Sequence, residues 1–99
     1  MSNIIENIDK FFENRVRLGI MSVLMVNEKT DFKSIKKMLN ASDGNIASHM
    51  NALEKQGYVE IEKQFIGKKP NTTYKATEKG KEAFSAHLNA LENLIKGKI

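Results

Sequence analysis

Three hydrogen-bonding side chains in the segment 43–56 have the types and spacing that could recognise a polyanion. Asn45, Ser48 and His49 can each hydrogen-bond the edge of a base or a phosphate oxygen. No acidic side chain stands between Asp43 and Glu54 to repel such a partner. An ordinary solvated helix face has the same composition, so this segment alone leaves both interpretations open.

The middle of the chain carries the whole positive excess. Residues 33–81 contain ten lysines and five acidic residues, whereas residues 1–32 contain four basic and five acidic residues and residues 82–99 two of each. The formal net charge of +4 therefore favours an anionic partner for the middle segment. Any single lysine could still be an ordinary solvated residue. The side chains that we expect to touch the anion are Lys33, Lys55, Lys63, Lys68, Lys69 and Asn71.

The start of the segment 43–56 offers a further anion contact. Backbone N–H groups at a helix N-terminus bind anions, and Gly44 has no side chain to hold a phosphate away. Ser42 and Gly44 therefore join the candidate contacts, although Gly44 could instead relieve crowding at a tight turn. Asp43 is unfavourable beside a phosphate, and we expect it to cap the helix or to hold a neighbouring lysine.

Catalytic and metal-binding chemistry find little support in the residues. The chain has no cysteine and only two histidines, His49 and His87, and no nucleophile with a base, carboxylate pair or phosphate loop occurs at a convincing spacing. We therefore expect a protein that is not an enzyme and that needs neither metal nor cofactor. The first twelve residues lack a continuous apolar run, which predicts no signal peptide, no membrane span and a cytoplasmic location.

Hydrophobic periodicity predicts the elements that position these side chains. A helical stretch is expected up to Phe12 and a central core helix from about Val16 to Asn27. Asp31 would cap a helix of two turns, Ser42 or Asp43 a helix that ends at Gln56, and Thr77 a last helix of roughly 18 residues. Between them, alternation from Tyr58 predicts a strand, Gly67 to Asn71 a turn, and Thr72 to Ala76 the returning strand.

The helix, turn, helix and basic hairpin, in this order, resemble the small winged helix-turn-helix DNA-binding proteins related to the MarR and ArsR groups. The most specific parts are the stretch from Asp43 to Glu60, which contains SHMNALEKQGYVE, and the hairpin GKKPNTTYKATEKG. The resemblance covers about residues 14–94. It implies an α+β fold with mostly helical content, major-groove contacts from the helix 43–56, wing contacts at Lys68 and Lys69, and a homodimer formed through the terminal helices.

The residues and the resemblance together predict one domain over residues 1–99. Segments 1–13 and 77–96 would form the dimer, 32–56 the helix-turn-helix, and 58–76 the wing. Its function would be sequence-specific binding of double-stranded DNA at a near-palindromic operator as a homodimeric repressor. The helix 43–56 would read the major groove, and the wing 63–75 would contact the backbone or the minor groove. The alternative is a winged-helix adaptor that binds an acidic protein without sequence-specific DNA binding. The expected dimer interface consists of Ile4, Ile8, Phe11, Phe12, Phe84, His87, Leu88, Leu91 and Ile95.

Overall fold

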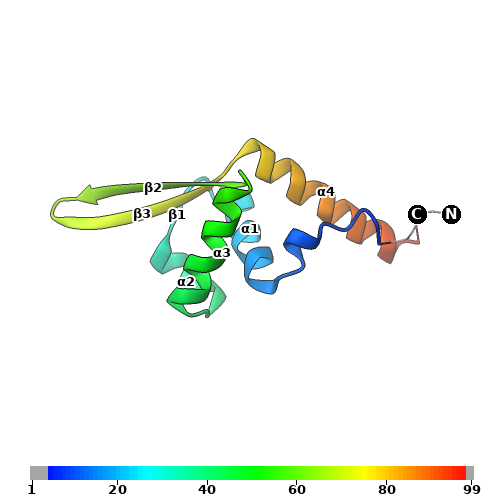
Figure 1. The fold of residues 1–99 in the computed structure, drawn as a ribbon, viewed down its shortest axis with the longest axis horizontal. Helices are drawn as coiled ribbons and strands as arrows, with labels where there is room; N and C mark the ends of the chain where they lie inside the picture. Colours follow the sequence, from blue (N-terminus) through cyan, green and yellow to red (C-terminus); the bar gives the residue numbers. More distant parts are fainter. Residues whose placement is uncertain (1–4, 98–99) are drawn as a thin grey trace.

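A group of helices forms the centre of the structure and a long hairpin projects from it (Figure 1). The computed structural model describes residues 5–97. Along the chain the elements are η1 (Lys10–Phe12), α1 (Arg15–Val26), β1 (Thr30–Asp31), α2 (Phe32–Leu39), α3 (Asp43–Lys55), β2 (Val59–Ile66), β3 (Lys69–Ala76) and α4 (Glu78–Ile95). This order of elements confirms the predicted mostly helical α+β fold.

Local capping explains where the helices begin. The side chains of Asp31, Ser42 and Thr77 accept hydrogen bonds from the backbone N–H groups of Ser34, Asn45 and Gly80, respectively. Each of these bonds satisfies one of the N–H groups that the first turn of a helix leaves without a partner. The three predicted caps are therefore confirmed.

The N-terminal segment is not the helix that its apolar spacing predicts. Within the described residues before α1, the helical part is the single 3-10 turn η1. The Asp9 side chain accepts from the N–H of Phe11, and the Asn14 side chain accepts from the N–H groups of Val16 and Arg17. The cap at Asn14 agrees with the expected break between the first helical stretch and α1, whereas the cap at Asp9 starts a separate short turn, so the first stretch is not helical up to Phe12 as expected. Ile4 lies outside the described residues.

The three strands pair antiparallel in the order β1-β3-β2. Val59 is opposite Ala76 and Ile66 is opposite Lys69, so the hairpin closes through the two residues Gly67 and Lys68. Gly67 adopts a φ of +65°, which a tight two-residue turn requires at its first position. The predicted five-residue turn is therefore wrong, because Lys69, Pro70 and Asn71 already belong to β3.

β1 was not predicted, because only Thr30 and Asp31 form it and their partners are Tyr74 and Thr73, far along the chain. Pro70 is compatible with β3 because β1 does not extend that far, and no strand among the described residues pairs with the outer edge of β3 there. The short strand β1 therefore connects the base of the wing to α2. It pairs with β3 on one side, and the first residue of α2 directly follows Asp31.

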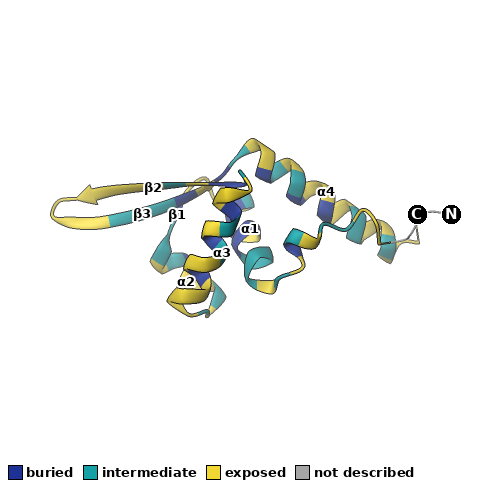
Figure 2. Cartoon of the chain, viewed as in Figure 1, coloured by how far each residue is buried: buried dark blue, intermediate teal, exposed yellow. Residues whose placement is uncertain are grey.

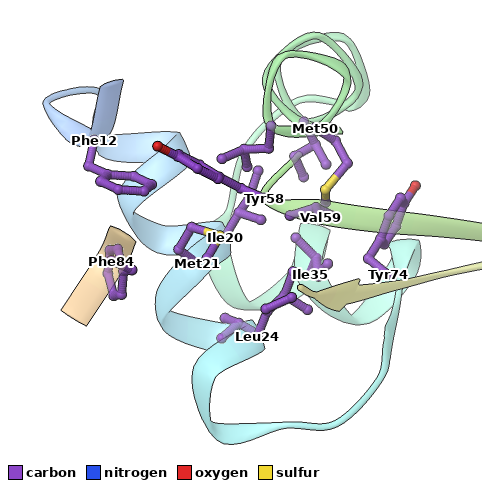
Figure 3. Packing of buried hydrophobic residues seen from close by; sticks show 14 residues of the cluster. Phe12, Ile20, Met21, Leu24, Ile35, Met50, Tyr58, Val59, Tyr74 and Phe84 are labelled. Atoms are coloured by element: carbon purple, nitrogen blue, oxygen red, sulfur yellow. The ribbon is translucent and has the colours of Figure 1, made fainter. Parts of the chain in front are cut away.

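The core lies where α1 meets the other helices and the base of the hairpin (Figures 2 and 3). Ile20, Met21 and Leu24 of α1 are at most 1% exposed, which confirms α1 as the central helix. The core is completed by Phe12, Val23, Ile35, Ile46, Met50, Leu53, Tyr58, Val59, Tyr74, Ala76 and Phe84. The hairpin and the far end of α4 extend away from this core in opposite directions (Figure 1).

Candidate nucleic-acid interface

The helix α3 buries one face and presents the opposite face to solvent. Ile46, Met50 and Leu53 are at most 1% exposed, as their spacing predicts. On the opposite side, spacings of four, three and four residues place a row of exposed positions. This row, called the outer row below, consists of Gly44, Ser48, Asn51 and Lys55. Asn45 is also exposed, at the margin of the row.

His49 does not face solvent as the sequence analysis expects. It is half-buried, and its Nδ1 accepts a hydrogen bond of 3.1 Å from Nε of Arg17 in α1. Burial, and secondarily the charge of Arg17, lowers the pKa of His49 below its ordinary value of 6.5. His49 is half-buried because of helical geometry. Position 49 is three residues after Ile46 and four before Leu53, so it borders the buried face of α3. The half-buried Ala52 lies on the same border.

Asn51 is the surface residue that the sequence analysis missed. It is exposed in the outer row and lines the groove between α3 and the wing. Its spacing of three residues from Ser48 and four from Lys55 is the signal that could have identified it.

The N-terminus of α3 is open to an approaching group. Gly44 is exposed, and a Cβ added there would meet nothing within 4 Å. Crowding within the chain is therefore not the reason for this glycine. Asp43 forms an ion pair with Lys36 of α2, which matches the expectation that it holds a neighbouring lysine.

The wing and α3 lie side by side and form the walls of one groove. Ala47, Asn51 and Glu54 line it from α3, and Lys63 and Thr72 line it from the hairpin. Glu54 is thus the acidic side chain on the α3 wall of this groove. The polar helix surface and the lysine-bearing hairpin could consequently touch a single partner.

Further lysines extend this surface along the wing. Lys68 and Lys69 are exposed at its tip. The half-buried Asn71 lines a second groove together with Lys69 and with Lys33, which is exposed in the first turn of α2. All eleven expected nucleic-acid contacts are therefore exposed or half-buried positions on α2, α3, the turn before α3 or the wing. His49 differs from the expectation because its side chain is engaged by Arg17.

The residues expected at a dimer interface fall into two groups. Phe12, Phe84 and His87 are buried within the chain itself, at 1%, 1% and 3% exposure. The Nδ1 of His87 accepts a hydrogen bond of 3.1 Å from the backbone N–H of Asp9. These three side chains thus belong to the core of one chain and offer no surface to a partner, because Phe12 packs edge-on against Phe84 and lies 5.4 Å from the ring of His87.

The second group remains accessible on α4 and near η1. Leu88 is 42% and Ile95 86% exposed, and Leu91 between them is half-buried. Ile8 is half-buried, and Phe11 packs edge-on against Tyr58.

Residues 5–97 lack the features of a metal site and of a membrane-spanning helix. No group of three or more histidine, cysteine, aspartate or glutamate side chains there could hold a metal ion. Among the same residues, no helix is both long enough and apolar enough to cross a membrane.

Comparison with known proteins agrees with this geometry. A protein from Methanocaldococcus jannaschii is 36% identical over 87 residues, which is 88% of this chain and 95% of that protein. A structure described as a transcriptional regulator homologue from Pyrococcus horikoshii superposes with a TM-score of 0.84 at 35% identity, covering 95% of this chain and 91% of that one. A putative MarR-like transcription regulator from Bacillus cereus shares the fold, with a TM-score of 0.72 at 21% identity over 96% of this chain and 70% of that one.

A family model described as a winged helix DNA-binding domain matches residues 16–95. This match includes α1 through α4 almost completely and thus both walls of the groove between α3 and the wing. The chain therefore belongs to the winged helix DNA-binding domain family.

Proposed function

We propose that this protein is a homodimeric transcriptional repressor that binds a near-palindromic site in double-stranded DNA. The observation that carries the proposal is the shared groove, because it brings Asn51 of α3 and Lys63 of the wing to the same side of the molecule. The description of the Pyrococcus horikoshii relative as a transcriptional regulator homologue supports the same role.

The two walls have different tasks in this proposal. The outer row of α3 enters a major groove, which is about 12 Å wide, and Ser48 and Asn51 hydrogen-bond base edges. The amide of an asparagine can pair with adenine through two hydrogen bonds, so Asn51 is the stronger source of sequence selection. Lys63, Lys68 and Lys69 contact phosphates, which fixes the position of the protein without reading sequence.

The open N-terminus of α3 adds a backbone contact. Because a Cβ at Gly44 would meet no atom of residues 5–97 within 4 Å beyond its own helical turn, the first turn of α3 can approach a phosphate closely, and its free N–H groups favour a negative charge. The ion pair between Asp43 and Lys36 reduces the repulsion that the Asp43 carboxylate would otherwise exert.

A second copy of the chain completes the site. In a two-fold dimer the two α3 helices occupy successive major grooves about 34 Å apart, so the preferred sequence is near-palindromic. The exposed apolar side chains of α4 support this assembly, since Leu88 is 42% and Ile95 86% exposed. Occupying the operator would exclude the polymerase, and this gives repression.

The test distinguishes phosphate contacts, which position the protein on DNA, from base contacts, which select the sequence. Preferred sites are first selected from a random DNA pool, and affinities are then measured for the selected and a scrambled duplex. Lys68→Ala with Lys69→Ala should weaken binding to both duplexes alike. Asn51→Ala should weaken only the selected site, by about 1 to 3 kcal/mol if a good contact is lost. Lys10→Ala is the matched control, because Lys10 is exposed on η1, on the other side of the core from the wing.

Salt dependence provides a second measurement on the same samples. With roughly six to ten phosphate contacts per dimer, affinity should fall about 10³- to 10⁵-fold between about 50 and 200 mM salt. Equal losses on both duplexes for all variants would contradict the division of tasks. Failure to bind any duplex, with capture of an acidic protein instead, would favour the adaptor function.

A further inference from the structure

The tip of the wing exposes two large apolar side chains. Phe65 is 73% and Ile66 is 65% exposed. In the described part of the chain, no aromatic or cation–π contact involves the ring of Phe65. A single exposed apolar residue is common on protein surfaces, but Phe65 presents an aromatic ring near the end of a projecting hairpin whose outer part is exposed (Figure 2). Ile66 faces the other side of the strand and lines the second groove with Lys33, so Phe65 is the side chain that packing within the chain does not explain.

The strand register places Phe65 on the same side of the hairpin as the proposed DNA surface. Side chains alternate along a strand, so Phe65 shares a face with Ile61 and Lys63, both of which line the groove with α3. Pro70 is directly opposite Phe65 on the neighbouring strand. The pair Phe65 and Pro70, called the apolar tip below, thus continues the α3-facing surface outward.

Charge identifies the partner that this apolar tip suits. Residues 63–77 contain four lysines and no acidic residue, and Lys63, Lys68 and Lys69 lie within a few residues of the apolar tip. A small apolar pair of side chains surrounded by lysines matches the minor groove of DNA. There, sugars and base edges form the floor, and a row of phosphates lies along each side. An apolar protein surface would not require the lysines.

We infer that the apolar tip is a wedge that enters the minor groove beside the major groove occupied by α3. This inference rests on the proposed function, in which the lysines of the wing contact the DNA, and adds to it a role for the apolar side chains at the tip of the wing. Phe and Pro side chains can press between base pairs from the minor-groove side, which partly unstacks them and bends the duplex toward the major groove. Pyrimidine–purine steps such as TA unstack most easily, so the wedge selects such a step at the position of the wing.

The experiment compares Phe65→Ala with wild type on a selected duplex that carries a TA step at the wing position. Phe65→Ala should lose about tenfold in affinity, and the slope of log affinity against log salt should not change, because a neutral side chain displaces no counterions. Lys68→Ala should instead reduce that slope by about one. Donor and acceptor dyes on the DNA ends should show a smaller bend with Phe65→Ala.

Two further variants control for other effects. Val26→Ala removes an apolar side chain that is 82% exposed at the end of α1 and should bind like wild type. Phe65→Leu keeps an apolar side chain and should retain most of the affinity. Circular dichroism and sedimentation of each variant confirm that fold and assembly are unchanged.

Several results would overturn the wedge. One is wild-type affinity and bending for Phe65→Ala; another is a lower affinity that sedimentation traces to a lost dimer. A third is that Phe65→Ala loses binding to vesicles of anionic lipid while its DNA binding is unaffected. If wild type binds DNA and Phe65→Ala binds it equally, the wedge alone fails. If wild type binds no duplex, the proposed function fails together with it.

Discussion

Arg17 connects three parts of the chain through one side chain. Its Nε donates to Nδ1 of His49 in α3, and its guanidinium carbon lies 4.3 Å from the centroid of the Phe11 ring. Its Nη1 also donates to the backbone carbonyl of Phe11 at 3.4 Å. The helix that carries the outer row is therefore held against both α1 and the N-terminal segment by a contact that depends on a neutral His49.

Acidification should weaken this contact. The pKa of His49 is lowered in the folded protein by burial and then by Arg17, so the unfolded chain binds a proton at higher pH than the folded chain does. The free energy of unfolding is therefore greatest above the ordinary pKa of 6.5 and decreases as pH falls through it toward the lowered value. Urea unfolding of wild type at about pH 7.5 and about pH 5.5 should show this decrease.

His49→Asn isolates the effect of this histidine. Asparagine can offer Arg17 an oxygen acceptor that does not titrate in this range, so the decrease in unfolding free energy on acidification should be smaller in the variant. His87 is unchanged in the variant. An identical change with pH in wild type and His49→Asn would show that the Arg17 contact does not depend on protonation.

Individual positions on α3 could be predicted from the sequence only in part. The buried row of Ile46, Met50 and Leu53 follows directly from the helical period. His49 and Asn51 differ because their places depend on where α1 and the wing pack, and that is set by residues far along the chain. The hydrogen bond from Arg17 to His49 joins residues 32 positions apart and leaves no local pattern.

At the scale of elements, the turn after α3 and the start of α4 lock together. The backbone N–H of Thr77 donates to the carbonyl of Tyr58 at 3.0 Å, and its hydroxyl donates to the carbonyl of Gly57 at 2.6 Å. Gly80 in the first turn of α4 lies directly against the backbone of Tyr58, where a Cβ would overlap its carbonyl oxygen. The close approach fixes the base of the wing relative to α4.

Gly80→Ala should therefore destabilise the fold. Alanine favours a helix interior by about 1 kcal/mol over glycine, but the overlap with a backbone atom should cost more, with a net loss of about 1 to 3 kcal/mol in unfolding free energy. Gly44→Ala is the control, because a Cβ there meets nothing within 4 Å, and it should leave stability unchanged or slightly raised. Urea denaturation measures both, and a gain in stability for Gly80→Ala would refute the close contact.

Elements that depend on local chemistry were predicted and those that depend on distant pairing were not. Asp31, Ser42 and Thr77 cap helices through bonds to residues three positions ahead, which a sequence displays directly. β1 exists only because Thr73 and Tyr74 pair with it. Near the N-terminus, the expected break before α1 is present at the Asn14 cap, but the apolar spacing did not show that Asp9 caps a separate short turn.

The whole molecule is elongated, 58 × 25 × 21 Å, with the wing and the far end of α4 at opposite ends (Figure 1). This arrangement separates the proposed DNA surface from the proposed dimer surface. The helix α4 serves two purposes along its length, since Phe84 and His87 complete the core of its own chain whereas Leu88 and Ile95 remain exposed. The sequence showed one continuous apolar row, and only the packing of Phe12 against Phe84 reveals where the core ends and the free surface begins.

Leu88→Glu combined with Ile95→Glu should convert the proposed dimer to a monomer. Burying a leucine or isoleucine completely contributes about 1.5 to 3 kcal/mol, and two side chains from each of two copies are affected, so the dimer dissociation constant should rise at least about 100-fold. Val26→Glu is the matched control, because Val26 is 82% exposed on α1, away from this surface. Sedimentation equilibrium measures the change, and the variant should bind a palindromic site no more tightly than a half-site, because the two α3 helices are no longer linked. A wild-type protein that stays monomeric at every concentration, or a double variant that still dimerises, would place the assembly surface elsewhere.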